Sequence, residues 1–133
     1  MTAMINVQPK SPKILVVDDE ALVRSMMCDG LAAAGHTVLA ASSGEEALQV
    51  VHAARPACVL LDIMMPDLDG YDTCAALKAD PQTASIPVLL VSATTDGRVT
   101  DEAKKVGAAA VLRKPVRIDE LQRAISQVLG ASA

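Results

Sequence analysis

Five short apolar runs recur along the chain, and each is followed by a longer segment in which apolar residues return every three or four positions. The runs lie near residues 13–17, 37–41, 57–61, 87–91 and 109–113. Each run is too short for a helix and too continuous for a half-exposed strand. The pattern therefore predicts five buried parallel strands.

The segments that follow the runs predict five helices. In the first, Leu22, Met26 and Gly30 recur at intervals of four residues, with Val23, Met27 and Leu31 beside them, and together they define an apolar face. Ser43 and Glu46 form a capping box that opens the second helix. The apolar positions of the remaining three are Cys74 and Leu77, then Val99, Ala103 and Val106, then Ile118, Leu121, Ile125 and Val128.

Strict alternation of strands and helices predicts the α/β class, with a parallel sheet that helices cover on both faces. Five such units suit a (βα)5 flavodoxin-like doubly wound parallel sheet with strand order 2-1-3-4-5, whereas a TIM barrel needs eight. We expect one domain over residues 12–130, preceded by a flexible N-terminal lead-in over residues 1–11.

Composition narrows the classes of function. The 133 residues carry a formal net charge of −4 without a basic block, which argues against direct binding of nucleic acid. One Tyr, with no Phe or Trp, leaves few platforms on which bases or a flavin could stack. No signal peptide or membrane-spanning run is present, so we expect a cytoplasmic protein without membrane insertion.

The cysteines do not indicate a metal site. Cys28, Cys58 and Cys74 are odd in number, and their spacing matches no zinc pattern. Cysteine is among the most buried residue types, so we expect three reduced core residues.

Polar residues follow four of the predicted strands. Asp18 and Asp19 come after the first strand, Asp62 after the third, Ser92 after the fourth and Lys114 after the fifth. In the order 2-1-3-4-5 these strands are neighbours, and their carboxyl ends border the crevice where open α/β sheets bind ligands. We therefore expect three carboxylates, a hydroxyl and an ammonium group to converge there.

This set of residues indicates phosphoryl chemistry. Clustered carboxylates repel one another, and a hard divalent cation, Mg²⁺ rather than Ca²⁺ in a small open site, relieves the repulsion. A carboxylate can act as a nucleophile and form an aspartyl-phosphate. Taken singly, Asp19 fits a helix cap, Ser92 a loop residue and Lys114 a solvated charge. Their coincidence at one edge of the sheet favours a functional site.

Several motifs, in this order and spacing, resemble the receiver domain of two-component response regulators over residues 12–130. They are Ile14–Glu20, Leu61–Gly70, Val91–Ala93 and Gly107–Ala108 ahead of Lys114–Pro115. The resemblance implies that Asp62 accepts a phosphoryl group from a histidine kinase or phosphotransfer protein. It also implies that Asp18, Asp19, Asp62 and the backbone carbonyl of Met64 bind Mg²⁺.

The resemblance extends to the residues that respond to phosphorylation. It implies that Ser92, Ala93 and Lys114 bind the phosphoryl group and that Ser92 acts as the switch hydroxyl. The Lys114–Pro115 peptide bond is expected to be cis, and Met64 and Thr94 flank the site at positions that influence the phosphoryl lifetime. The charge added to Asp62 should pull Ser92 inward and shift the loop 93–98 and the fourth helix.

The sequence departs from the family at the output side. Val111 and Val116 occupy positions where the family commonly has aromatic residues, including the ring that swings inward on activation. A positively biased face on the fourth and fifth helices and the last strand suits either an unidentified output partner or solvent. Its residues are Arg98, Lys104, Lys105, Arg113, Arg117, Glu120 and Arg123.

Several alternatives remain open. The chain ends at Ala133, so it is either a stand-alone receiver or a fragment of a larger regulator or hybrid kinase, as a monomer or a phosphorylation-dependent dimer. A receiver-like scaffold that ignores phosphorylation is a further alternative. A Mg²⁺-dependent phosphatase is an alternative from the enzyme class, but it would need a second acid two residues after its nucleophile on the first strand and a hydroxyl residue after that acid, a combination that residues 18–22 lack. A flavodoxin-like cofactor module would need a first loop that binds phosphate, whereas the first loop here is acidic.

Overall fold

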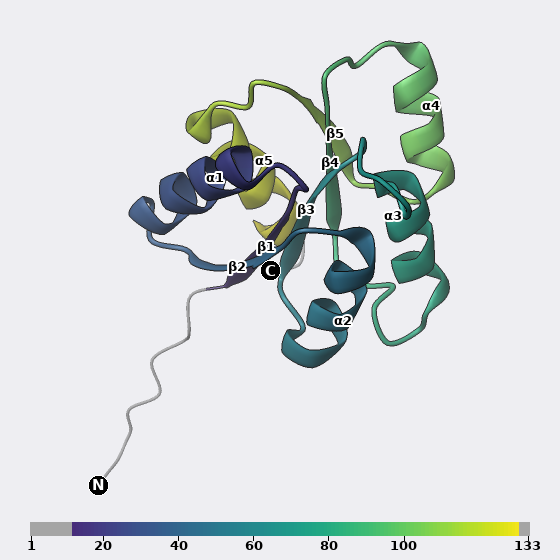
Figure 1. Cartoon of the computed structure of the whole chain (residues 1–133), viewed down its shortest axis with the longest axis horizontal. Coiled ribbons are helices and arrows are strands. Elements are labelled where there is room, and N and C mark those ends of the chain that lie inside the picture. Colours follow the sequence, from purple (N-terminus) through teal and green to yellow (C-terminus); the bar gives the residue numbers. More distant parts are fainter. Residues whose placement is uncertain (1–11, 131–133) are drawn as a thin grey trace, which may run out of the picture.

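A parallel sheet forms the centre of the computed structural model, which describes residues 12–130 (Figure 1). Within these residues the sheet has five strands in the order β2-β1-β3-β4-β5, which confirms the predicted flavodoxin-like topology. The strands are β1 (Lys13–Val17), β2 (Thr37–Ala41), β3 (Cys58–Asp62), β4 (Val88–Ser92) and β5 (Ala110–Arg113). The predicted flexible lead-in over residues 1–11 lies outside the described residues.

A helix follows each strand, and the helices cover both faces of the sheet. They are α1 (Ala21–Ala33), α2 (Gly44–Ala54), α3 (Gly70–Ala79), α4 (Gly97–Lys105) and α5 (Ile118–Gly130). Helices α1 and α5 lie on one face, and α2, α3 and α4 lie on the other (Figure 1). None of the helices within residues 12–130 has the length and apolar character needed to cross a membrane.

Alternate residues of the central strands build two separate cores. Leu15 and Leu61 face α2, α3 and α4, whereas Ile14 and Leu60 face α1 and α5. Every residue of β3 and β4 is buried, because each of these strands has a neighbouring strand on both sides and a helical layer on both faces. This double burial explains why these runs are continuously apolar instead of alternating.

The prediction that all five strands are buried is wrong at the edges of the sheet. The outer strands β2 and β5 are only partly buried, since each has a neighbouring strand on one side alone. Three strands also begin one residue later than predicted. As a result, Asp62 and Ser92 are the last residues of β3 and β4 instead of the first residues after them.

The predicted apolar face of α1 is also wrong in part. Of the residues predicted to form it, Leu22 and Met26 are 73% and 64% exposed, whereas Leu31 is fully buried as expected. Gly30 does face α5, since a Cβ added there would collide with the side chain of Ile118. The sheet and α5 together decide which stripe of α1 is buried, and intervals of four residues along α1 alone do not specify that stripe.

The capping box at α2 is present in a modified form. Ser43 Oγ accepts a hydrogen bond from the backbone N–H of Glu46 at 3.0 Å. The side chain of Glu46 accepts from the N–H of Ser42, at 2.6 Å, instead of the N–H of the cap residue. Both interactions use otherwise unsatisfied donors at the start of the helix.

The cysteine prediction holds for two of the three residues. Cys58 and Cys74 are buried, and Cys28 is only partly so. Burial raises the pKa of Cys58 to about 12 and that of Cys74 to about 11. All three are free thiols.

Candidate functional site

Three carboxylates converge at the carboxyl ends of two neighbouring strands. Asp18 and Asp19 follow β1, Asp62 ends β3, and one carboxylate oxygen from each lies within 4.8 Å of the others. Asp18 and Asp62 are buried, whereas Asp19 is exposed. The set is therefore reachable from solvent at Asp19, while its other two carboxylates are shielded.

Lys114 supplies the opposite charge. Its Nζ lies 3.1 Å from Asp62 Oδ1 and 3.4 Å from Asp18 Oδ2. The residue follows β5 and is held to β4 by its backbone N–H, which donates to the carbonyl of Ser92 at 2.8 Å. The Lys114–Pro115 peptide bond is cis. The long side chain thus crosses the end of β4 and reaches the acidic pocket on β1 and β3.

Burial and charge act in opposite directions on the two partners. Burial raises the pKa of Asp62, and the charge of Asp18 adds to that effect, while the hydrogen bonds from Lys114 and the Met64 backbone oppose it. For Lys114, burial alone would lower the pKa, but the hydrogen bond and charge of Asp62, together with Asp18, outweigh burial and raise it. Lys114 is therefore a cation at neutral pH.

Hydrogen bonds fix the acidic loop that follows β1. The guanidinium of Arg24 donates to the backbone carbonyl of Asp18 at 2.7 Å, and the N–H of Glu20 donates to the Asp18 carboxylate at 2.9 Å. Arg24 did not emerge from the sequence analysis. A usable signal was its place in the first turns of a helix, where the helix dipole disfavours a cation.

The loop after β3 packs directly on the phosphoacceptor candidate. A Cβ at Gly70 would lie 2.5 Å from the backbone oxygen of Asp62, so a larger residue cannot occupy this position without displacing the strand end. The N–H of Gly70 donates to the carbonyl of Ile63 at 2.9 Å. Met64, in the same loop, is 75% exposed beside the site.

The predicted switch residues lie on the next strand end. Ser92 is buried, and its Oγ accepts a hydrogen bond from the N–H of Thr94 at 3.2 Å. Ala93 and Thr94 are exposed in the loop that leads to α4. The buried hydroxyl of Ser92 is therefore connected to an exposed loop by a single hydrogen bond between neighbouring residues.

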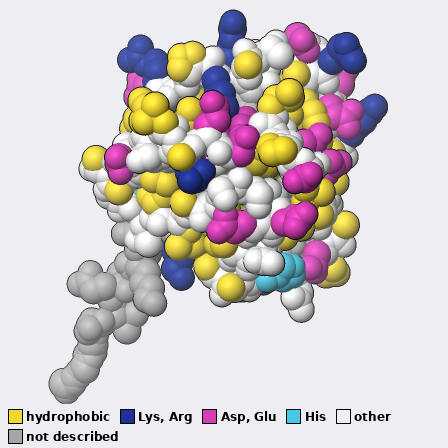
Figure 2. Space-filling model, in the orientation of Figure 1, with side chains coloured by type: hydrophobic (Ala, Val, Ile, Leu, Met, Phe, Trp, Pro, Cys, Tyr) yellow, Lys and Arg dark blue, Asp and Glu magenta, His cyan; other side chains and the backbone are white. Residues whose placement is uncertain are grey.

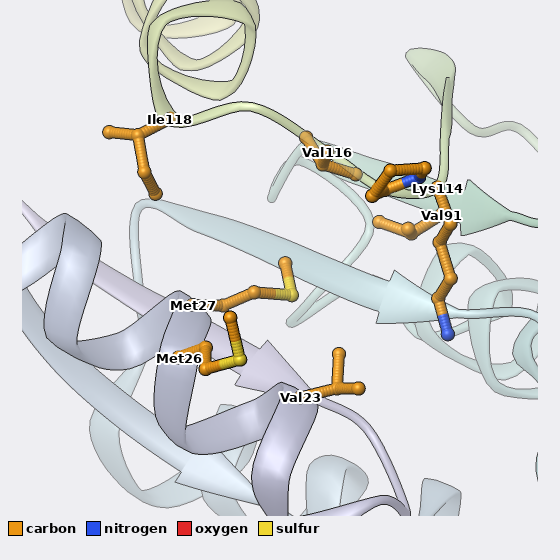
Figure 3. A pocket seen from close by; sticks show the side chains of 8 residues that line it. Val23, Met26, Met27, Val91, Lys114, Val116 and Ile118 are labelled. Atoms are coloured by element: carbon orange, nitrogen blue, oxygen red, sulfur yellow. The ribbon is translucent and has the colours of Figure 1, made fainter.

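An apolar groove of about 460 Å³ adjoins the acidic pocket and was missed by the sequence analysis. Val23, Met26 and Met27 on α1 face Val116 and Ile118 across it (Figure 3). Lys114 lines both the groove and the pocket. Leu22, Met26 and Met64 are the large apolar side chains that the described residues expose, and we call them the apolar rim.

The charges elsewhere on this side of the molecule are mixed. In Figure 2, acidic and apolar side chains are interspersed across the visible face, and basic side chains lie mainly at its periphery, including over the position of α4. Two ion pairs among the described residues, Arg117–Asp119 and Arg123–Asp119, lie on α5 and the segment before it.

The donor set fits a hard divalent cation. Asp18, Asp19 and Asp62 offer carboxylate oxygens, which Mg²⁺ prefers, and two of the three are held in place by strand ends or loop hydrogen bonds. The position of Lys114 is also compatible with a bound cation. Lys114 pairs with Asp18 and Asp62, so the carboxylate of Asp19 stays unpaired among the described residues.

A doubly wound sheet with an acidic pocket and a lysine at its carboxyl edge defines a class of α/β domains whose ligands bind outside the strand ends. Within this class, the family model of the response regulator receiver domain matches residues 14–126, and the chain belongs to that family. Receiver domains are signalling domains of two-component systems, and they typically use Mg²⁺.

Individual relatives agree with this assignment. The chain is 36% identical over 119 residues to "Protein PilH" of Pseudomonas aeruginosa, covering 88% of this chain and 97% of that protein. It is 38% identical over 117 residues to "Probable transcriptional regulator ycf27" of Guillardia theta, covering 88% of this chain and 45% of that protein. The chain thus spans about half the length of the ycf27 relatives.

A solved structure shows the same fold. The chemotaxis protein CheY4 of Vibrio cholerae has a TM-score of 0.86 and is 32% identical, with 90% of this chain and 99% of that chain covered.

Proposed function

We propose that residues 12–130 form a receiver that accepts a phosphoryl group on Asp62 from a histidine kinase or phosphotransfer protein. The observation that carries the proposal is the convergence of Asp18, Asp19 and Asp62 around Lys114, whose Nζ lies 3.1 Å from the Asp62 carboxylate. Phosphoryl transfer depends on positioning and on neutralisation of charge, and this cluster offers both.

In the proposed reaction, a carboxylate oxygen of Asp62 attacks the phosphorus of the donor phosphohistidine. A phosphorus–oxygen bond forms as the phosphorus–nitrogen bond breaks, and the released imidazole takes a proton from solvent. Asp18, Asp19, Asp62 and the backbone carbonyl of Met64 would hold Mg²⁺, which when bound supplies positive charge against the phosphoryl oxygens.

Two side chains of this chain then respond to the new group. Lys114 turns its ammonium from the Asp62 carboxylate to an oxygen of the phosphoryl group bound there. The displacement is short, because the ammonium already contacts the carboxylate that carries the new group. Ser92 donates its hydroxyl proton to another phosphoryl oxygen, with the neighbouring Ala93 amide as a further donor. Met64 and Thr94 flank the acyl phosphate and influence its hydrolysis.

The apolar rim supports a protein phosphodonor over a small molecule. All three residues of the rim are exposed: Met26 lines the groove beside Lys114, Leu22 lies in the first turn of α1 after the acidic loop, and Met64 follows Asp62 by two residues. Exposed apolar side chains gathered at one place mark interaction surfaces. Phosphorylation then changes the affinity of an output protein for the face formed by α4, β5 and α5. In this proposal the chain is cytoplasmic, and it signals through protein partners without contacting nucleic acid directly.

Intact mass after incubation with acetyl phosphate tests the proposal. The wild-type protein should gain the mass of one phosphoryl group with Mg²⁺ and none with EDTA. Asp62→Asn should gain none, whereas Asp72→Asn, a matched change on α3, should behave as the wild type. A wild-type protein that gains no mass with Mg²⁺ would contradict the proposal and favour a receiver-like scaffold that acts without phosphorylation.

A further inference from the structure

Helix α4 is weakly anchored in the fold. Ala103 is its one buried residue, and Val99 is half-buried. The residues from Ala93 to Arg98, ahead of and inside its first turn, are exposed. An element with so little buried apolar surface opens or shifts more readily than the central strands. The position of α4 therefore depends strongly on the hydrogen bonds at its N-terminus.

Those hydrogen bonds form a continuous series that starts at Ser92. Ser92 Oγ accepts from the N–H of Thr94 at 3.2 Å, and Thr94 Oγ1 accepts from the N–H of Asp96 at 3.3 Å. Asp96 Oδ1 then accepts from the N–H groups of Arg98 and Val99 at 3.0 and 3.2 Å. Asp96 is the N-cap of α4, and such a cap typically contributes about 1 kcal/mol.

The first turn of α4 also borders the one aromatic side chain of the protein. Tyr71 lines a groove of about 420 Å³ together with Asp96, Arg98, Val99 and Glu102. It directly follows Gly70, which packs on the backbone of Asp62. Tyr71 therefore follows the residue that packs on Asp62, and its side chain borders the cap of α4.

We propose that Asp96 is a positioning residue that transmits the state of the site to α4, and that Tyr71 senses the resulting shift. This inference rests on the proposed function. When Ser92 donates to a phosphoryl oxygen, its Oγ turns away from the Thr94 N–H, and the loop that holds Asp96 rearranges. The cap moves, and the first turn of α4 changes its contact with Tyr71. β5 carries Val111 and no aromatic residue, so Tyr71 on α3 is the aromatic side chain whose contacts can report the shift.

Tyrosine emission measures the inference directly, since the chain has no Trp and Tyr71 is its single Tyr. Addition of acetyl phosphate and Mg²⁺ should change the emission of the wild-type protein in step with the gain in intact mass. Asp96→Ala should still gain the phosphoryl mass but lose at least half of the emission change. Asp96→Asn keeps a capping oxygen and should restore it, and Ser43→Ala, which removes the matched cap of α2, should leave the response intact.

A second measurement needs no phosphorylation and separates this inference from the proposed function. In the unphosphorylated protein, Ser92→Ala removes the acceptor for Thr94, so amide exchange of Arg98 and Val99 should become several-fold faster while α2 is unaffected. Unchanged exchange in Ser92→Ala would overturn the coupling even if Asp62 accepts a phosphoryl group. A full emission response in phosphorylated Asp96→Ala would overturn it as well.

Discussion

Lys114 Nζ lies 3.1 Å from Oδ1 of Asp62, closer than its 3.4 Å distance to Oδ2 of Asp18. The ammonium group thus contacts the carboxylate that we propose as the nucleophile and also one of the two acids that would hold a cation beside it. Lys114 neutralises the buried acids in the absence of metal, and it shares their oxygens with any cation that enters. Removing Lys114 should therefore affect cation binding and phosphoryl transfer in opposite directions.

The variant Lys114→Met tests this opposition. It should bind Mg²⁺ roughly three- to tenfold more tightly, because a neighbouring positive charge no longer repels the cation. Phosphorylation by acetyl phosphate should nevertheless slow by at least about tenfold, because a charge-assisted hydrogen bond to the phosphoryl group is lost. Calorimetric titration with Mg²⁺ and time-resolved intact mass give the two values. Weaker Mg²⁺ binding in Lys114→Met would show that the ammonium supports the metal site instead of competing with it.

The raised pKa of Asp62 makes the metal-free protein sensitive to pH. Burial first, and then the charge of Asp18, raise this pKa above its ordinary value of 3.8. The folded state therefore holds the proton more tightly than the unfolded chain. The stability that Asp62 contributes is complete below about pH 3.8 and is lost as the pH rises through the raised pKa.

Asp62→Asn should accordingly raise the melting temperature in EDTA at pH 7 by a few degrees, because the variant has no buried carboxylate to ionise. The difference from the wild-type protein should shrink as the pH is lowered toward 4, and calorimetry across this range provides the check. Added Mg²⁺ should reverse the order at pH 7, since it stabilises the form with the charged carboxylate. A constant difference between pH 4 and pH 7 would exclude ionisation of Asp62 as its cause.

Arg24 should influence the site without touching a ligand. Its guanidinium donates to the carbonyl of Asp18 at 2.7 Å and fixes the loop that carries two of the three acids. Arg24→Met should weaken Mg²⁺ binding by roughly three- to tenfold, in line with the loss of one charge-assisted hydrogen bond. Arg24→Lys, which retains a donor, should recover part of the affinity. If Arg24→Met lowers only the melting temperature and leaves the Mg²⁺ affinity unchanged, Arg24 has a structural role alone.

The apolar rim should matter only for a protein phosphodonor. Replacement of Leu22 and Met26 by Ser removes exposed apolar contacts from α1 while leaving the acidic pocket intact. Transfer from a phosphotransfer protein that phosphorylates the wild-type chain should lose about tenfold or more in kcat/KM, as for truncation of interface anchors. The rate with acetyl phosphate should stay within about twofold, and Gln127→Ser on α5 serves as the control. Equal losses with both donors would place the effect in the pocket instead of in docking.

The central strands and the candidate site could be predicted from the sequence because their signals are local. Leu60 and Leu89 belong to apolar runs that only a doubly covered strand explains, and these runs led to the correct strand order. Once the order is known, residues at the carboxyl ends of the strands must share one edge. Asp18, Asp19, Asp62 and Lys114 do meet there.

Other features could not be predicted, because they depend on which surfaces meet after folding. The chain contains apolar residues on more than one stripe of α1, and only docking against the sheet and α5 buries Leu31 and exposes Leu22 and Met26. The groove beside Lys114 exists because α1 and the segment after β5, far apart in the sequence, face each other (Figure 3).

The sequence by itself determined the alternation of strands and helices, the order of the sheet and the set of charged residues at its edge, since hydrophobic periodicity and the geometry of parallel strands constrain all three. The tertiary structure alone decided the pairing of Lys114 with Asp62, the contact of Arg24 with the Asp18 backbone and the place of Tyr71 beside the cap of α4. These contacts join residues whose side chains can point in many directions, and only the packing of the complete domain selects one.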